Sequence, residues 1–374
     1  MTRPALAACL AVLLPATALA GGVRGDLGPA VRERLVALRA AHDVPALAGL
    51  VAIDGQVAGV AAVGSRRLGA PEGVTVDDLW HLGSCTKAMT ATLIGRLVER
   101  ELLRLDTTLG EVYPDVEMNP AWRSVTVEQL LCHRAGAPVG LERDGLWGRL
   151  FTDQETPLPS LRRTVVEHVT AVPPAPAPGT AFLYSNPGYT LAGAVAEQVT
   201  GRPYEDLLRE EVFAPLKMTR AGFGAPPGDA SPRGHRRDWR GVTVMEPEAF
   251  ASDNPATIAP AGTVHAPLDD WARFALAHLR GARGEDGLLL RAETFKALHA
   301  PRGDERYALG WGSVERDWAG GRALTHSGSN TMWFATVVVA PDAGVVALVV
   351  TNAGDPAAAS ACTEGVKALV ALGR

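Results

Sequence analysis

The chain has 374 residues, of which 47% are apolar and 21% are charged, with 40 glycines and 27 prolines. This composition is typical of a folded globular chain and excludes collagen, coiled coil and disorder. The formal charge of −5 comes without a basic block, which argues against nucleic acid as the main partner. Because the length exceeds what one hydrophobic core usually fills, we expect two packed subdomains with a ligand site in the cleft between them.

The first twenty residues have the layout of a secretory signal peptide. Arg3 provides a positive start, residues 5–14 form an apolar run, and Ala18-Leu19-Ala20 has the small-x-small form that signal peptidase reads. We predict cleavage after Ala20 and a periplasmic or secreted protein. Two alternatives are disfavoured: a lipid anchor at Cys9, because the apolar run before it is too short, and an uncleaved apolar helix.

Hydrophobic periodicity predicts strands at both ends of the chain and helices between them. A first hairpin joins strands over 47–53 and 56–63 through Asp54-Gly55, a dipeptide typical of tight turns. A second hairpin pairs 335–339 with 345–350, and its turn at 341–344 splits the most apolar stretch, so no membrane span is predicted there. Helical spacing of apolar residues predicts helices over residues 29–42, 84–101, 126–133, 188–199 and 267–279. This order indicates a discontinuous α/β domain that holds a helical one.

A serine and a lysine stand three residues apart at the start of the second predicted helix, in Gly83-Ser84-Cys85-Thr86-Lys87. Residues i and i+3 share a helix face, which places the Lys87 amine beside the Ser84 hydroxyl. Burial there lowers a lysine pKa and makes the amine a base near neutrality. The helix start also favours developing negative charge. The alternative is that Ser84 caps the helix and Lys87 is solvated.

Two more segments carry functional groups. Tyr184 and Asn186 form a Tyr-x-Asn between a Pro- and Gly-rich loop and a predicted helix. Residues 324–330, Leu-Thr-His-Ser-Gly-Ser-Asn, precede the final hairpin. Each segment is weak alone, because a buried tyrosine or an edge-strand histidine is common in proteins. The three motifs in this order and at these separations form a specific set.

With these motifs the chain resembles the serine β-lactamase and penicillin-binding-protein superfamily, in the branch of class C β-lactamases, D-alanyl-D-alanine carboxypeptidases, D-aminopeptidases and family VIII-type esterases. The resemblance implies an α/β fold, with an antiparallel sheet flanked by helices on both faces and an inserted, mainly helical subdomain. We therefore expect the α/β subdomain at 21–85 and 255–374, the helical subdomain at 86–254, and the active site in the groove between them. The loops over 138–159 and 222–256 are expected to border this groove.

The resemblance also implies catalytic roles. Ser84 matches the acylated nucleophile and Lys87 its proton partner. Tyr184 matches the tyrosine that, with the lysine, passes the proton to the leaving group and then activates water. Asn186 matches the amide that holds the lysine and the acyl side chain of the substrate. The resemblance calls for no metal or organic cofactor.

The strand motif departs from the family pattern. His326, Ser327 and Gly328 occupy the triplet that many members write Lys-Thr-Gly, and the backbone N–H groups of Ser84 and Ser329 would form the oxyanion hole. A histidine is mostly neutral at pH 7, whereas the usual lysine supplies a fixed charge for a substrate carboxylate. This departure favours peptidase or esterase chemistry over an efficient β-lactamase, by a modest margin.

Three cysteines follow the predicted leader: Cys85, Cys132 and Cys362. An odd number leaves at least one thiol unpaired in an oxidising compartment, and a Cys85 to Cys132 bridge stays open. Cys85 is an alternative nucleophile at a helix start, but its side chain points about 100° away from that of Ser84, which favours packing. His133 is interpreted as a hydrogen-bonded core residue.

The sequence therefore predicts an exported serine hydrolase that acts through an acyl-enzyme on small amides or esters, such as D-alanyl peptides or β-lactams. The alternatives are a carboxylesterase with the same catalytic residues and a non-catalytic penicillin-binding sensor or scaffold. The chain has no Gly-x-Ser-x-Gly elbow and no His-Glu-x-x-His or Cys-x-x-Cys motif, which disfavours an α/β-hydrolase triad and a zinc site. The expected partner is a small molecule or short peptide; the oligomeric state is left open.

Overall fold

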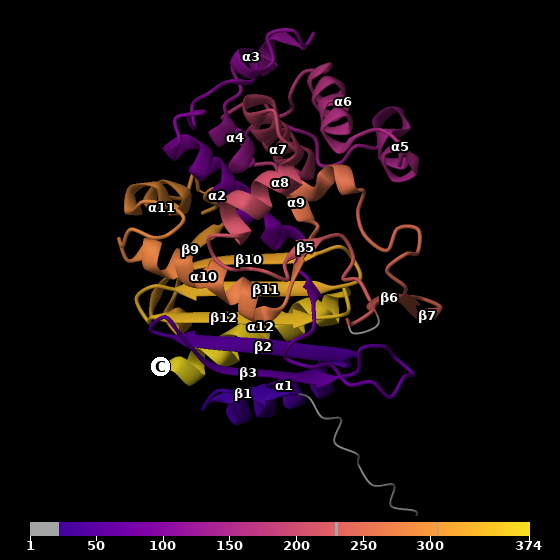
Figure 1. Ribbon diagram of the computed structural model, residues 1–374, viewed down its shortest axis with the longest axis vertical. Coiled ribbons are helices and arrows are strands. Elements are labelled where there is room, and N and C mark those ends of the chain that lie inside the picture. The colour runs from indigo at the N-terminus through magenta and orange to yellow at the C-terminus, as the bar shows by residue number, and fades with distance from the viewer. Residues whose placement is uncertain (1–21, 229–230, 305) are drawn as a thin grey trace, which may run out of the picture.

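A seven-stranded antiparallel sheet forms the base of the molecule (Figure 1). The computed structural model describes residues 22–228, 231–304 and 306–374, so the predicted signal peptide lies outside the described residues. In spatial order the strands are β1 (Val23–Arg24), β3 (Gln56–Gly64), β2 (Ala46–Ile53), β12 (Val345–Thr351), β11 (Phe334–Ala340), β10 (Gly321–Ser329) and β9 (Gly312–Arg316).

Both predicted hairpins are confirmed. Asp54 and Gly55 adopt φ values of 47° and 84°, the left-handed conformation that matches a tight two-residue turn to the twist of its strands. Strand β2 pairs with β12, so the N-terminal and C-terminal hairpins meet in the middle of the sheet. Every residue of β12 is buried, because helices cover both faces of this strand.

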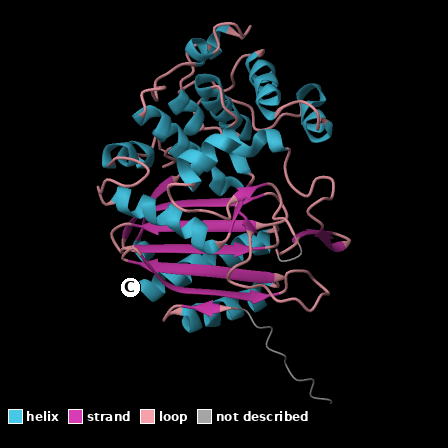
Figure 2. Cartoon of the chain, in the orientation of Figure 1, coloured by secondary structure: helices cyan, strands magenta, loops and turns pink. Residues whose placement is uncertain are grey.

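The helices on the two faces of the sheet come from different parts of the chain. Helices α1 (Gly28–His42) and α12 (Pro356–Val370) pack on one face, and α10 (Leu268–Ala282) packs on the other (Figures 1 and 2). The predicted fold class, an antiparallel sheet with helices on both faces and further helices inserted, is therefore confirmed. Helix α12 was not among the predicted elements.

A second group of helices lies beyond the β9 edge of the sheet (Figure 1). These helices are α2 (Thr86–Glu99), α3 (Leu109–Val112), α4 (Val127–Leu131), α5 (Leu146–Thr152), α6 (Leu158–Thr170), α7 (Asn186–Thr200), α8 (Tyr204–Leu208), α9 (Ala259–Gly262) and α11 (Ala292–His299). Helix α2 connects this group to the sheet, because the 3-10 turn Gly83–Cys85 that precedes it packs against β10. The predicted helix over 84–101 is thus a 3-10 turn followed by α2.

The two segments expected as groove-bordering loops contain regular structure. Helix α5 lies within 138–159. The segment 222–256 contains β5 (Gly222–Phe223) and a separate hairpin of β6 (Gly234–Asp238) and β7 (Gly241–Met245). Strand β5 pairs with β8 (Val264–Ala266), which also pairs with β4 (Trp80–His81) just before the Ser84 turn. The Leu82 N–H donates to the Val264 carbonyl oxygen at 2.8 Å, so β8 also holds the segment that leads into α2.

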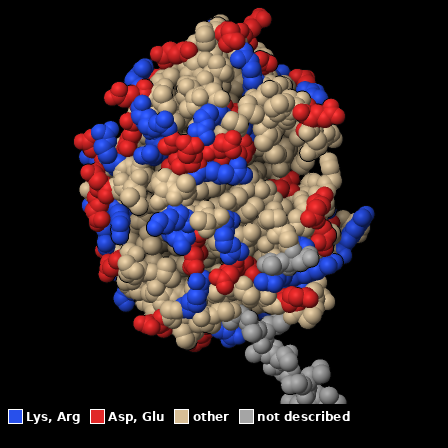
Figure 3. Space-filling model, viewed as in Figure 1, with Lys and Arg blue, Asp and Glu red and all other residues tan. Residues whose placement is uncertain are grey.

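The surface is mixed in charge. Basic and acidic side chains are interspersed over the face shown in Figure 3, in keeping with the small net charge. Among the described residues, no helix is both long and apolar enough to cross a membrane.

Candidate active site

Ser84 and Lys87 meet at the junction of the sheet and the helices. Ser84 lies in the 3-10 turn Gly83–Cys85 and is partly exposed, whereas its sequence neighbours on both sides are buried. The Lys87 amine lies 3.0 Å from Ser84 Oγ, as the i, i+3 spacing predicted. The same Nζ donates to Asn186 Oδ1 at 2.8 Å and to the Ala261 carbonyl oxygen at 2.7 Å. Three segments of the chain, around Ser84, Asn186 and Ala261, thus converge on one amine.

The surroundings of Lys87 favour the loss of its proton. The side chain is fully buried, and burial lowers the pKa of Lys87 from 10.5 to about 7. Its closest neighbours besides the hydrogen-bond acceptors are the rings of Tyr184 and Tyr189, whose centroids lie 4.8 Å and 5.5 Å from Nζ. The amine therefore reaches its neutral, basic form near pH 7.

In the neutral form the direction of the Lys87 lone pair follows from its partners. A neutral amine has two N–H bonds and one lone pair. The carbonyl oxygens of Ala261 and of the Asn186 side chain can only accept hydrogen bonds, so they take the two N–H groups. The lone pair then faces the Ser84 hydroxyl, which is the arrangement that a general base for that hydroxyl needs.

Tyr184 approaches Ser84 from the segment before α7. Burial raises the pKa of Tyr184 to about 12, and a side-chain hydrogen bond with Ser84 works against that rise. The Tyr184 ring packs on His133 with centroids 4.2 Å apart, and His133 Nδ1 accepts the backbone N–H of Ser185 at 3.1 Å. His133 is buried and hydrogen-bonded, as expected. It also supports Tyr184, which its position in the sequence did not indicate.

Strand β10 lies directly against the Ser84 turn. A Cβ atom added to Gly328 would lie 2.1 Å from the Leu82 carbonyl oxygen and 2.4 Å from Ser84 N, so only glycine fits there. Reciprocally, a Cβ atom on Gly83 would lie 2.3 Å from Ser329 N. The two backbone amides expected to form the oxyanion hole, Ser84 N and Ser329 N, are therefore on adjoining segments.

His326 contributes no charge to the site. Its Nδ1 lies 2.8 Å from the Ser327 carbonyl oxygen, which can only accept, so Nδ1 carries the proton. Its Nε2 then accepts the Tyr307 hydroxyl at 3.0 Å. Burial, with the nearby charge of Lys87, lowers the pKa of His326 to about 3. Ser327, in contrast, is exposed, and its hydroxyl lies 3.0 Å from that of Thr336 on β11.

The three cysteines in the described part of the chain are buried and unpaired. Cys85, Cys132 and Cys362 are free thiols, so the Cys85 to Cys132 bridge that the sequence left open is not formed. The Cys85 thiol points to the carbonyl oxygens of His326 and Ala335, and burial raises its pKa. A buried thiol of raised pKa is a poor nucleophile, which favours packing as the role of Cys85.

The structure thus brings Ser84, Lys87, Tyr184, Asn186 and the 327–329 segment together. Both ring nitrogens of His326 are hydrogen-bonded to other groups of the protein. The catalytic roles of these residues remain predictions. Ala261, whose carbonyl oxygen binds Lys87, was missed as a functional residue, because a backbone carbonyl group has no side-chain signature. Within the described ranges, no group of three or more His, Cys, Asp or Glu residues could hold a metal ion.

Comparison with known proteins identifies the family. The family model described as Beta-lactamase matches residues 31–371, and the chain belongs to this family. It is 30% identical over 335 residues to penicillin-binding protein 4 of Amycolatopsis lactamdurans, a match that covers 86% of this chain and 84% of that protein. It is 29% identical over 181 residues to the lovastatin esterase of Penicillium rubens, covering 43% of this chain and 44% of that protein.

The fold of a solved D-stereospecific amidohydrolase from Streptomyces sp. is also similar. That structure superposes with a TM-score of 0.71 at 24% identity, over 90% of this chain and 98% of that one. The resemblance inferred from the three motifs is confirmed: the chain is a member of a family of β-lactamase-fold serine hydrolases with penicillin-binding and esterase relatives.

Proposed function

We propose that the protein is an exported serine hydrolase that forms an acyl-enzyme at Ser84 from small amides or esters and then transfers the acyl group to water. The observation that carries the proposal is the hydrogen bonding of Lys87. Its two carbonyl acceptors turn the lone pair of the neutral amine toward Ser84 Oγ, 3.0 Å away. Burial supports this role, because it lowers the pKa of Lys87 to about 7 and so makes the neutral amine accessible.

In the proposed acylation step, Ser84 Oγ attacks the substrate carbonyl carbon while Lys87 Nζ takes the hydroxyl proton. The negative charge that develops on the carbonyl oxygen is bound by the backbone N–H groups of Ser84 and Ser329. When the tetrahedral intermediate collapses, the proton passes through the Tyr184 hydroxyl to the leaving nitrogen or oxygen. Deacylation repeats these steps, with water in place of Ser84 and the serine as leaving group.

The preferred substrates follow from the uncharged His326 in the triplet of residues 326–328. A buried, uncharged His326 offers a substrate carboxylate no fixed positive partner, so acyl donors that do not depend on this contact are favoured. Small amides without a free carboxylate, such as D-alanyl peptides with a blocked C-terminus, are the first candidate, in line with the names of the penicillin-binding and D-amidohydrolase relatives. A carboxylesterase is the second candidate, because the same neutral histidine suits an uncharged ester and one relative is named an esterase.

The nucleophile is tested by Ser84→Ala. This variant should lose all labelling by a fluorescent penicillin or a fluorophosphonate and all turnover, because only Ser84 carries the acyl group. Ser160→Ala, at an exposed position of α6, is the matched control and should behave as wild type. Turnover that persists in Ser84→Ala would refute the assignment.

A substrate panel separates the candidate functions. Rates on p-nitrophenyl butyrate, nitrocefin and a C-terminally amidated D-alanyl-D-alanine peptide should be measured side by side with the same enzyme sample. The proposal expects the peptide or the ester to be turned over faster than nitrocefin. Preference for the ester alone would favour the carboxylesterase. Labelling by fluorescent penicillin without any turnover would favour a sensor.

Export is tested on the mature N-terminus. When the full chain is expressed in a bacterium with a Sec pathway, the protein recovered outside the cytoplasm should begin at Gly21. A protein that keeps Met1 would contradict a cleaved leader, and a lipid-modified Cys9 would support the anchored alternative.

A further inference from the structure

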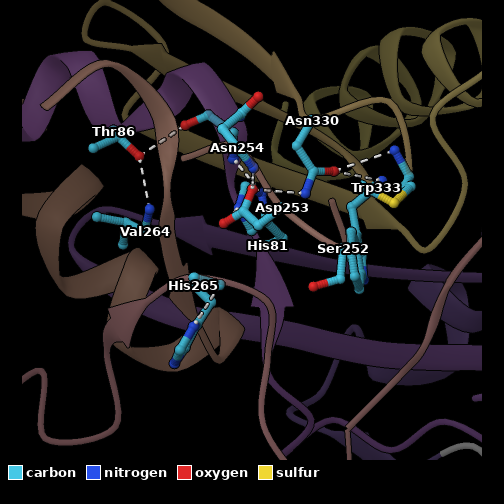
Figure 4. Close-up of polar contacts among 12 residues, drawn as sticks. His81, Thr86, Ser252, Asp253, Asn254, Val264, His265, Asn330 and Trp333 are labelled. Atoms are coloured by element: carbon cyan, nitrogen blue, oxygen red, sulfur yellow. Dashed lines mark hydrogen bonds and ion pairs between the residues drawn. The ribbon is translucent and has the colours of Figure 1, made fainter. Parts of the chain in front are cut away.

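The residue before the nucleophile is tethered at both of its peptide groups. The Gly83 N–H donates to His81 Nδ1 at 3.1 Å, and the Gly83 carbonyl oxygen accepts from Thr86 Oγ1 at 2.8 Å. Thr86 Oγ1 in turn accepts the backbone N–H of Val264 on β8 at 3.1 Å (Figure 4). Gly83 has φ of 50°, in the left-handed region that glycine adopts readily, so the two hydrogen bonds select one of several conformations open to this residue.

The proton arrangement on His81 has a single solution. A backbone N–H can only donate, so His81 Nδ1 must be the acceptor and the ring proton lies on Nε2. That Nε2–H donates to Asp253 Oδ2 at 2.8 Å. The His81 side chain is 0% exposed and the Asp253 side chain 8% exposed, and the His81 ring stacks on Trp333. The carboxylate therefore fixes both the tautomer and the orientation of the ring.

Asp253 also reaches the segment that carries the second oxyanion-hole donor. Its Oδ1 accepts Asn330 Nδ2 at 2.9 Å and the Asn254 backbone N–H at 2.7 Å. Asn330 Oδ1 accepts the backbone N–H groups of Met332 and Trp333, each at 3.2 Å. Asn330 thereby holds the turn from β10 to β11, next to Ser329. Figure 4 shows His81 and Asn330 converging on Asp253.

We infer that His81, Asp253 and Asn330 are positioning residues that hold the two oxyanion-hole donors, Ser84 N–H and Ser329 N–H, at a fixed separation. One chain of hydrogen bonds runs from Gly83, next to Ser84, through these three side chains to the turn that follows Ser329. The inference rests on the proposed function, since it assigns the two amides a shared oxyanion. Asp253 lies outside the three catalytic motifs, so the inference assigns the loop around it a role at the site.

The magnitude of the effect follows from the sensitivity of the oxyanion hole. Removing one donor of such a hole typically lowers kcat by about 10²–10³-fold, and a misplacement of roughly 1 Å can cost about 10²-fold. A positioning residue leaves both donors present but allows them to shift. We therefore expect losses of about 10- to 100-fold in the acylation rate when the network is broken.

Asp253→Asn breaks the network with almost no change in shape. Asp253 Oδ1 accepts two donors and Oδ2 accepts the His81 Nε2–H, so all incoming groups are donors. An amide has only one acceptor oxygen, and either orientation places its NH2 group against a donor. If His81 relieves the conflict by moving its proton to Nδ1, that proton faces the Gly83 N–H. The variant must therefore disturb one end of the network.

The experiment measures the second-order rate constant for labelling by a fluorophosphonate, together with kcat and KM for p-nitrophenyl butyrate. Asp253→Asn and His81→Gln, which keeps a donor near the Nε2 position but loses the Nδ1 acceptor, should lower the labelling rate and kcat by about 10- to 100-fold, with KM changed by less than about threefold. The matched control is His42→Gln, the same substitution in a histidine–carboxylate pair with Glu364 outside the site, which should leave the rates unchanged.

A rescue variant distinguishes positioning from a general loss of structure. In Asp253→Asn/Asn330→Asp the amide and the carboxylate exchange places, so the 253–330 hydrogen bond and the acceptor for His81 are both restored, and only the Asn254 backbone N–H loses its acceptor. This double variant should recover most of the lost labelling rate. If Asp253→Asn is too unstable to purify, His81→Gln provides the same comparison against wild type.

The outcomes separate this inference from the proposed function. A wild-type protein that neither labels nor turns over substrate would refute the proposed function itself. A wild-type protein that labels, with Asp253→Asn and His81→Gln labelling at the same rate, would overturn the network while leaving the function intact. The network would also be overturned if Asp253→Asn and His81→Gln changed only KM. It would be overturned as well if the double variant Asp253→Asn/Asn330→Asp recovered none of the lost labelling rate.

Discussion

Two buried basic side chains in this molecule lie in opposite electrostatic surroundings, so that the pKa of one is raised and that of the other is lowered. Arg162, on α6, is fully buried and bonds to the carboxylates of Glu197 and Glu205. Burial lowers its pKa, but the two carboxylate charges outweigh burial and raise it. Lys87 is just as buried, but its acceptors are a hydroxyl, an amide oxygen and a carbonyl oxygen.

The difference explains which of the two groups can do chemistry. An arginine keeps its proton in proteins, and the carboxylates that pair with Arg162 give it the role of holding helices together. A lysine whose partners are all neutral loses its proton near pH 7, as the lowered pKa of about 7 for Lys87 indicates. We therefore expect Lys87 to matter for activity and Arg162 for stability, and a pair of matched substitutions tests this division.

Lys87→Met is expected to have the largest effect on activity. Methionine fills a similar volume but has no basic group, so kcat/KM for p-nitrophenyl butyrate should fall by about 10²–10⁴-fold. The free energy of unfolding, measured with urea, should fall little or even rise, because a costly buried amine is removed. Lys367→Met, at an exposed position of α12, is the control. If Lys87→Met lost activity only because it unfolds, this would contradict the assignment of Lys87 to activity and Arg162 to stability.

Arg162→Met should give the converse result. Glu197 and Glu205 would lose their buried partner, which should lower the free energy of unfolding by about 3–5 kcal/mol, while kcat/KM per folded molecule changes by less than about twofold. The neighbouring Arg163 makes exposed pairs with Asp115 and Glu167, so Arg163→Met should cost less than about 1 kcal/mol. A large fall in kcat/KM at unchanged stability would show that Arg162 acts on the site.

The pH dependence of activity gives a finer test of the lysine. The base form of Lys87 is neutral, so kcat/KM should rise with pH up to a midpoint near 7 and level off above it, falling about tenfold per unit below the midpoint. The titratable groups around Lys87 do not titrate there: burial lowers the pKa of His133 and His326 and raises that of Tyr184, Tyr189 and Cys85. A profile flat from pH 5 to 9 would contradict the assignment of Lys87 as the base.

The sequence predicted those parts of the site and fold that depend on local spacing. The i, i+3 relation placed Lys87 beside Ser84, and turn chemistry identified both hairpins. The 3-10 turn at Gly83–Cys85 was missed, because close packing of β10 on Gly83 decides the local geometry there. The β6–β7 hairpin was missed as well, since β6 (Gly-His-Arg-Arg-Asp) is polar and shows no apolar alternation.

The remaining parts of the site depend on contacts between distant segments. Asp253 lies 172 residues after His81 and 77 before Asn330, and no spacing rule relates them. The Ala261 carbonyl that binds Lys87 is a backbone group without a side-chain signature. The orientation of the His326 ring follows from Tyr307, whose hydroxyl it accepts. Such features become visible only when the fold is known.

A third buried base, His278 on α10, extends the comparison to a group that stays neutral. Thr92 Oγ1 donates to the Ala88 carbonyl oxygen, so it accepts from His278 Nε2, and His278 Nδ1 then accepts from His299 Nε2. Burial lowers the pKa of His278 from 6.5 to about 3. Below pH 6.5 the unfolded chain binds a proton that the folded protein does not, so this contribution to stability is complete above pH 6.5 and is lost as pH falls toward 3.

The smallest expected effect is therefore a change in the slope of stability against pH. Between pH 6 and 4 the His278 site should contribute up to about 1.4 kcal/mol per pH unit to the decline in the free energy of unfolding. His278→Asn keeps an acceptor near the Nδ1 position for His299 but does not titrate, so its decline should be shallower than that of wild type, although its stability at pH 7 is lower. Urea unfolding at several pH values measures both slopes. Equal slopes would mean that protonation of His278 is not what destabilises the folded protein in acid, and the contrast with Lys87 would then rest on activity alone.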